Sequence, residues 1–201
     1  MSTTSQPEPP SSVPTAGSKA RYWHGRVNEH GKWITDHCGL RQPPGEELAA
    51  LRAGLGRGAF TEPRLWPHYS TPTDGRVTDE LEAEHAALSL YGLHQQGQND
   101  AMHRRGTSTG RALRALHERF GEDAVDRRVA AAVSATTVAA LVHRLKGLVT
   151  QLRVVHQPLD YDQLLLDIQH WHYPEGRSRV RRQWGLAYHL RRPRPDDEQR
   201  S

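Results

Sequence analysis

The stretch TTVAALVHRLKGLVTQLRVVHQPLDYDQLLLDIQHWHYPEGRSRVRRQWGLAY, residues 136–188, decides the fold of this chain. Apolar residues recur three and four positions apart over 138–155, which is the spacing of a helix with one buried face. Pro158 ends that helix, because proline has no backbone N–H to donate. We predict two further helices after it, separated from each other by Pro174 and Gly176.

The two later helices of this stretch have signatures of their own. Asp160 and Gln163 have the spacing of a capping box, so we expect the second helix to begin at Asp160. The third helix carries arginines on its outer faces. The segment with the most regular apolar spacing therefore ends in the part of the chain where positive charge is densest. The residues predicted to face inward are Tyr161, Leu164, Leu165, Ile168, Trp171, His172, Val180, Trp184, Ala187 and Tyr188.

Helical spacing extends to the rest of the chain, and no segment alternates apolar and polar residues over a useful length. The further helices are predicted over 19–38, over 45–55, from a capping box of Asp79 and Glu82 onward, over 109–120 and over 122–133. The predicted fold class is therefore all-α, a two-lobed helical bundle with disordered polar tails. The predicted parts are a disordered tail (1–18), an N-terminal helical lobe (19–120), a C-terminal helical lobe (121–191) and a polar tail (192–201).

The composition excludes several classes of protein. Only 35% of the residues are apolar, which predicts a modest core and a large wet surface. No apolar run approaches the roughly 20 residues of a membrane-spanning helix. The N-terminus lacks the basic start and apolar segment of a signal peptide, so we expect a cytoplasmic location. The single cysteine, Cys38, excludes an internal disulfide, and we expect its side chain to be buried or half-buried.

Catalytic and metal-binding patterns are weak. Thirteen histidines are present without an HExxH motif, and His170 and His172 lie on different sides of their predicted helix. The sequence GTSTG over 106–110 matches a nucleophile elbow but follows a polar loop rather than a strand, so we expect Thr107 or Ser108 to cap a helix instead. We therefore expect no enzyme activity, no metal and no cofactor. A small enzyme that uses a histidine remains an alternative, but the sequence indicates no substrate for it.

Positive charge is the feature that points to a partner. The net charge is +4, and six arginines but no acid lie between Arg177 and Arg192. Segregated positive charge favours a polyanionic partner, although a solvated arginine-rich surface would have the same composition. Further cations flank the glycine-rich turn over 54–58, where free amides suit phosphate, and the helix start near residue 106. The predicted nucleic-acid-binding residues are Arg52, Arg57, Arg104, Arg105, Arg111, Arg114, Arg144, Lys146, Arg153, Arg177, Arg179, Arg181 and Arg182.

The chain resembles the small subunit of the type I-E CRISPR surveillance complex Cascade, the CasB family. The resemblance rests on LAALRAGLGRG over 48–58 with Trp66, on Arg144 and Leu145, on LDYDQLLLDIQHW over 159–171, and on RVRRQWGLAY over 179–188. It covers roughly residues 45–190. None of these segments is a catalytic signature, and the long N-terminal tail and the PEG sequence over 174–176 stand apart from the pattern.

The resemblance implies an all-α, non-catalytic subunit present as two copies in a crRNA-guided complex. The implied partners are the backbone subunits and the large subunit, a second copy of the chain, the crRNA, and the target and non-target DNA strands, with no membrane. Guide pairing would read the sequence while the protein holds backbone charge, in a salt-dependent manner. The alternative is a freestanding helical regulator that binds nucleic acid, for which the sequence shows no clear helix-turn-helix.

Overall fold

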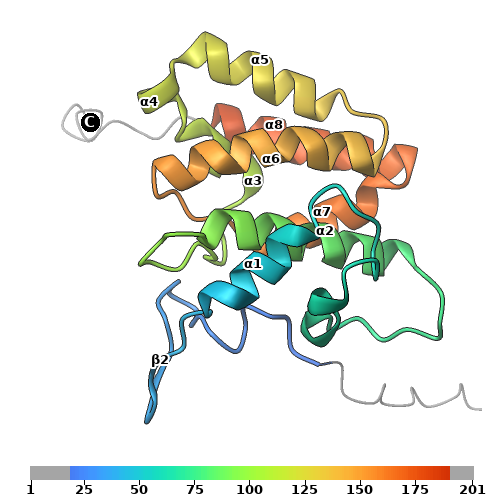
Figure 1. Cartoon of the computed structure of the whole chain (residues 1–201). Coiled ribbons are helices and arrows are strands. Elements are labelled where there is room, and N and C mark those ends of the chain that lie inside the picture. Colours follow the sequence, from blue (N-terminus) through green and yellow to red (C-terminus); the bar gives the residue numbers. More distant parts are fainter. Residues whose placement is uncertain (1–18, 191–201) are drawn as a thin grey trace, which may run out of the picture.

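The computed structural model describes residues 19–190, in which α-helices dominate and the only sheet is a small hairpin (Figure 1). The predicted tail over 1–18 and the residues after 190 lie outside the described part of the chain. The all-α class is confirmed. The elements are β1 (Thr35–Asp36), β2 (Gly39–Leu40), α1 (Gly45–Ala53), the 3₁₀-helix η1 (Pro63–His68), α2 (Asp79–Gln95), α3 (Thr109–Arg114), α4 (His117–Phe120), α5 (Glu122–Val133), α6 (Val138–Val154), α7 (Tyr161–Trp171) and α8 (Pro174–His189).

The three helices of the deciding stretch are α6, α7 and α8, as predicted. Asp160 caps α7, since its carboxylate accepts the backbone N–H groups of Asp162 and Gln163 at 3.1 Å each. The reciprocal half of the capping box is missing, because the Gln163 side chain donates to Asp167 instead. Nine of the ten residues predicted to face inward belong to these helices, and eight are buried; Ala187 and His172 are half-buried.

The break between the second and third predicted helices lies just before Pro174 and does not extend to Gly176. The break falls at residues 172–173, and α8 begins at Pro174, whose missing N–H costs nothing in a first helical turn. Gly176 lies inside α8 because α8 crosses α7 closely there. A Cβ atom at Gly176 would lie 2.1 Å from the backbone oxygen of His170, so only glycine fits without a shift.

The predicted helix over 19–38 is wrong. This segment consists of turns, a bridge between Val27 and Trp33, and the hairpin of β1 and β2. Gly31 and Gly39 have positive φ angles, which end a helix and favour turns. The expectation for Cys38 is also wrong, since this residue is exposed in the hairpin turn. Trp23 is the anchor of the segment, because it is fully buried against the helices.

Smaller corrections concern helix ends. The predicted helix over 109–120 is split into α3 and α4, which lie on either side of Ala115 and Leu116. The predicted capping box of Asp79 and Glu82 is replaced by a cap one residue earlier, where the Thr78 hydroxyl accepts the N–H of Leu81. The helices predicted over 45–55 and 122–133 are confirmed as α1 and α5.

One continuous apolar core holds the helices together. It runs from Trp23 and Leu51 in the first half of the chain to Trp171 and Trp184 in the second, all nearly or fully buried. Helix α2 lies in its middle and contacts α1, α6 and α7, while α3 packs against α8. Elements of both halves of the chain share this core. The division into two lobes, 19–120 and 121–191, stays a prediction. No helix in the described range is long and apolar enough to cross a membrane.

Candidate nucleic-acid interface

Exposure divides the thirteen predicted cations into two groups. Four are half-buried, namely Arg52, Arg153, Arg177 and Arg181. Nine are exposed, namely Arg57, Arg104, Arg105, Arg111, Arg114, Arg144, Lys146, Arg179 and Arg182. A phosphate contact needs a reachable side chain that no acid of the protein already neutralises. The hydrogen bonds and ion pairs of each cation therefore decide which of them suit the role.

The arginines of α8 have two different functions. Arg177 Nη1 donates to the backbone oxygen of Trp171 at 3.1 Å, which satisfies a carbonyl at the end of α7. Arg181 donates to the backbone oxygen of Ala135 at 2.9 Å and lies over the ring of Trp171. These two guanidinium groups tie α8 to its neighbours. Arg179 and Arg182 are exposed and have no hydrogen-bond or acidic partner among residues 19–190.

The cations around α3 are partly balanced by acids. Arg105 lies 3.5 Å from Asp162, and Arg114 lies 3.7 Å from Glu122. Arg104 and Arg111 are exposed and make no ion pair within the described range. The expected anion site at this helix start is weakened, because α3 has only six residues and Ser108, its N-cap, makes no side-chain cap bond.

Asp162 connects this region to the first turns of the described chain through its contacts with Trp23, His24 and Arg105. Its carboxylate accepts Trp23 Nε1 at 2.8 Å and His24 Nε2 at 2.7 Å. Burial opposes ionisation, but the hydrogen bonds from His24 and Trp23 prevail and lower the pKa of Asp162. The ionised carboxylate holds the N-terminal segment onto α7 and orients Arg105 beside it. No local pattern could reveal this, since about 140 residues separate the partners.

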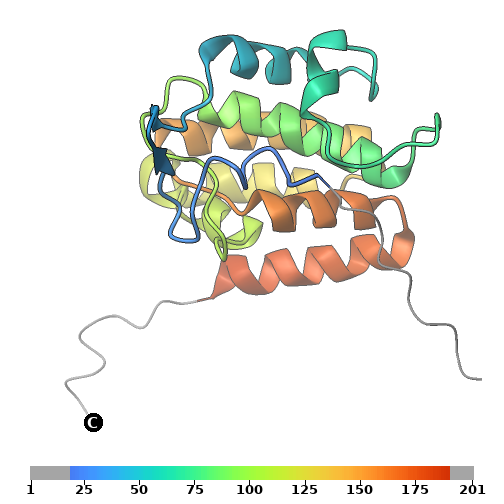
Figure 2. The same ribbon diagram turned by 90° about the horizontal axis from the view of Figure 1, so that it is seen from below.

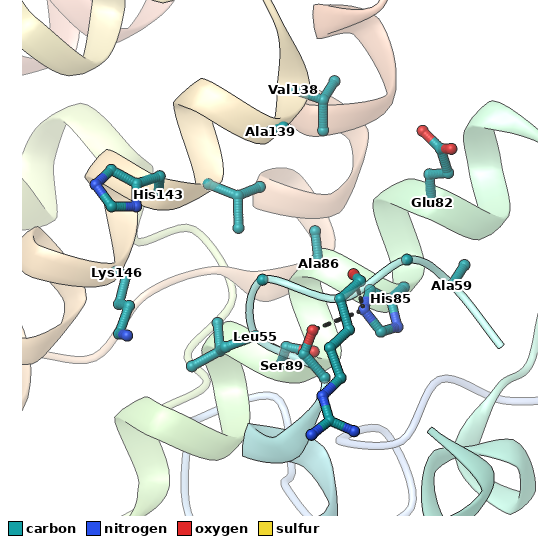
Figure 3. A pocket seen from close by; sticks show the side chains of 15 residues that line it. Leu55, Ala59, Glu82, His85, Ala86, Ser89, Val138, Ala139, His143 and Lys146 are labelled. Carbon is teal, nitrogen blue, oxygen red and sulfur yellow. Dashed lines mark hydrogen bonds between the residues drawn. The ribbon is translucent and has the colours of Figure 1, made fainter. Parts of the chain in front are cut away.

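The cations of α6 face in different directions. Arg144 donates to the backbone oxygen of Ala131 at 2.7 Å, and Arg153 donates to Gln96 at 3.0 Å, so both link α6 to adjacent helices or loops. Lys146 is exposed and has no acidic partner among the residues described. It lines a pocket together with Arg57, which belongs to the glycine-rich turn after α1 (Figure 3).

Arg57 is partly neutralised in this turn. It lies 2.8 Å from Glu62, which also accepts Arg64 Nε at 2.8 Å. The hydrogen bond from Arg64, and the charge of Arg57, lower the pKa of the Glu62 carboxyl. Arg52 is on the inner side of α1, where its Nε is buried without a hydrogen-bond partner.

The predicted cations do not form a single patch. Helices α1 and α8 lie at opposite edges of the molecule when it is seen from below, so Arg179 and Arg182 are remote from the glycine-rich turn (Figure 2). The structure does bring Arg57 and Lys146 together. It also places His85 and Ser89 in the same pocket, which the sequence analysis missed. Polar residues on the buried face of a predicted helix are the signal that would have identified them.

A group of metal-ligating side chains occurs in the hairpin. One ligand atom each from Asp36, His37 and Cys38 lie within 4.8 Å of one another. The Asp36 carboxylate is already engaged by Arg41 Nε at 2.7 Å. Asp36 is half-buried while His37 and Cys38 are exposed, and we assign the group no role.

The fold and site together define a helical protein with a rigid apolar core and solvent-facing cations distributed over several helices. The family model of CRISPR-associated protein Cse2 matches residues 47–189. The crystal structure of CasB from Thermobifida fusca is similar to this chain, with a TM-score of 0.59 and 32% identity over 73% of this chain and 85% of that chain. No curated protein matches this sequence. The chain belongs to the Cse2 (CasB) family of small subunits of the CRISPR Cascade complex, which confirms the resemblance.

Proposed function

We propose that this protein is the non-catalytic small subunit of a type I-E Cascade, present as two copies and acting in antiviral defence in the cytoplasm. It binds the nucleic-acid backbone and stabilises the target and displaced DNA strands of the R-loop. Its partners are the backbone subunits, the large subunit, the second copy of itself, the crRNA and both DNA strands. Family membership supports the association with Cascade. We propose in addition the copy number, the nucleic-acid binding, the stabilisation of the R-loop and the individual partners.

The observation that carries the DNA-binding part is that five of the thirteen predicted cations are exposed and have neither an acidic nor a side-chain hydrogen-bond partner among the described residues. These are Arg104, Arg111, Lys146, Arg179 and Arg182. Since they lie on a rigid helical core and not beside a base-reading motif, they suit phosphate groups of any sequence. Arg177 and Arg181 hold the fold, so their replacement is expected to act through stability.

The first experiment is co-purification of the tagged chain with the neighbouring gene products and a CRISPR array. Elution with a crRNA-containing particle that holds two copies of the chain supports the proposal. Elution alone, with tight binding to one duplex sequence, would favour the freestanding regulator instead.

A second experiment separates the cations that bind DNA from the rest of the surface. Arg179→Glu with Arg182→Glu reverses two exposed charges on α8, and Arg127→Glu with Arg128→Glu makes the same change on α5 as a matched control. We expect the α8 variant to shorten R-loop lifetime and to lower the salt slope of binding by about one for each lost phosphate contact. Equal behaviour of the two variants would show that the α8 pair is bystander surface.

A further inference from the structure

The pocket that Arg57 and Lys146 share is a built cavity between two parts of the core. Its volume is about 380 Å³, which is in the range of small-ligand sites. The glycine-rich turn forms one wall, α2 the floor and α6 the opposite wall (Figure 3). The apolar lining comes from Leu55, Ala59, Ala86, Val138, Ala139 and Val142. Such walls suit a flat apolar group better than a bare anion.

Charge is unevenly distributed around this cavity. Lys146 and His143 lie at one side of it, and Glu82 lies at the other (Figure 3). The Glu82 carboxylate lies 3.7 Å from His172 Nε2, and His172 does not line the pocket. Arg57 forms an ion pair with Glu62, which partly neutralises its positive charge. The side of Lys146 is therefore the anion-attracting end of the pocket.

A buried polar atom in the floor lacks a partner. Ser89 is 1% exposed, and its Oγ has no hydrogen-bond partner in the described structure. The oxygen has almost no accessible surface because the turn covers it, so it belongs to the floor under the turn and does not face a ligand in the pocket. The hydroxyl lies close under the turn, since a Cβ atom at Gly54 would be only 2.4 Å from it.

The wall formed by the turn is held in one conformation. His85 Nε2 donates to the backbone oxygens of Gly54 and Arg57, at 3.0 Å each, and Nδ1 accepts the hydroxyl of Tyr69 at 2.7 Å. Gly56 has a φ angle of 78°, which favours glycine. The pocket is thus preformed, and a ligand would not have to order the turn when it binds.

We propose that this pocket receives one unstacked nucleobase of a single strand, with the adjoining phosphate beside Lys146. The apolar walls sandwich the base, as protein pockets do for extruded bases. A base carried by its own anionic backbone matches a cavity that is apolar inside and cationic at one end. The inference rests on the proposed function, since it names how a strand held by this subunit is engaged.

The test compares a short single-stranded oligonucleotide with an abasic strand of equal length, both titrated at low salt onto the full-length chain. We expect the abasic strand to bind about five- to a hundredfold more weakly, the range that one base contact supplies. A 2-aminopurine base in the normal strand is expected to change its fluorescence on binding, because it leaves its stacked neighbours.

A variant that fills the pocket gives the specific control. Ala139 is exposed at the pocket wall, so Ala139→Phe occupies the cavity without overpacking the core, and Ala130→Phe on exposed α5 is the matched control. We expect Ala139→Phe to abolish the preference for the normal strand and the 2-aminopurine signal, while binding of the abasic strand stays unchanged. Ala130→Phe is expected to behave as the wild type.

The outcomes distinguish the two proposals. Equal binding of normal and abasic strands by the wild type would overturn the base pocket and leave backbone binding intact. The absence of binding to either strand at low salt would overturn both. A loss of assembly into the Cascade particle in Ala139→Phe, with base-dependent binding unchanged, would show that a protein side chain occupies the pocket instead.

Discussion

The buried carboxyl of Asp167 makes the stability of this protein depend on pH in an unusual direction. Asp167 is 1% exposed on α7; it accepts Trp184 Nε1 at 2.6 Å and Gln163 Nε2 at 2.9 Å. Burial raises the pKa of Asp167 to about 6, against which the two hydrogen bonds act only in part. The folded state therefore holds a proton that the unfolded chain releases.

The magnitude follows from this pKa difference. Between the ordinary value of 3.8 and about 6, Asp167 binds more protons in the folded state than in the unfolded state, so its contribution to the free energy of unfolding falls as the pH rises. Each pH unit in that window is worth about 1.4 kcal/mol, which gives about 3 kcal/mol in total. Below the window the penalty is absent, and above it the full penalty is present.

Asp167→Asn removes this titration with little change of shape. The asparagine oxygen accepts Trp184 Nε1, and its amide donates to the Gln163 side chain once that amide turns its oxygen inward. We expect the stability of the variant relative to the wild type to rise by about 2–3 kcal/mol between pH 4 and pH 7. Urea unfolding followed by circular dichroism at several pH values measures this difference.

The control is Asp123→Asn, at an exposed position of α5 without an ion pair in the described structure. We expect its stability relative to the wild type to be almost independent of pH. A stability difference for Asp167→Asn that stays flat from pH 4 to pH 7 would refute the reasoning, because it would mean that the buried carboxyl titrates normally.

Three further predictions concern packing and acid sensitivity. Gly176→Ala is expected to lower the free energy of unfolding by about 1–3 kcal/mol, because the added Cβ would overlap a backbone oxygen of α7. Gly185→Ala in the same helix has open space around the new Cβ and is expected to raise the free energy of unfolding by about 0.5–1 kcal/mol. Thermal unfolding measures both changes. Trp171→Ala should cost about 3–5 kcal/mol since the ring is fully buried, and Trp66→Ala, 51% exposed, should cost less than about 1 kcal/mol in the same assay. Burial lowers the pKa of His103 to about 4, so the contribution of this histidine to stability is lost as pH falls from about 6.5 to about 4, opposite in sign to the contribution of Asp167. The stability of His103→Gln relative to the wild type should therefore rise as pH falls through that range in urea unfolding, and a constant difference would contradict the assignment.

The helices themselves could be predicted from local pattern. The apolar spacing over 138–155, the cap at Asp160 and the proline at 158 act between residues a few positions apart, so they appear in the sequence directly. The segment over 19–38 was misread because Trp23 is buried by residues far along the chain, and no local spacing records that contact. The family, too, was recognisable from sequence, and the family model matches residues 47–189 of the chain.

The sequence by itself determined the fold class and the family, and it supplied the cations that we predict to bind nucleic acid. Only the tertiary structure decided how those cations are used. Arg177 and Arg181 bond to carbonyls of other elements, whereas Arg179 and Arg182, on the same helix, stay exposed. The pocket at Lys146 likewise arises where α6 meets a turn some ninety positions earlier in the chain. The physical reason is the same in both cases, because hydrogen-bond partners and cavity walls are set by how helices pack and not by spacing along one helix.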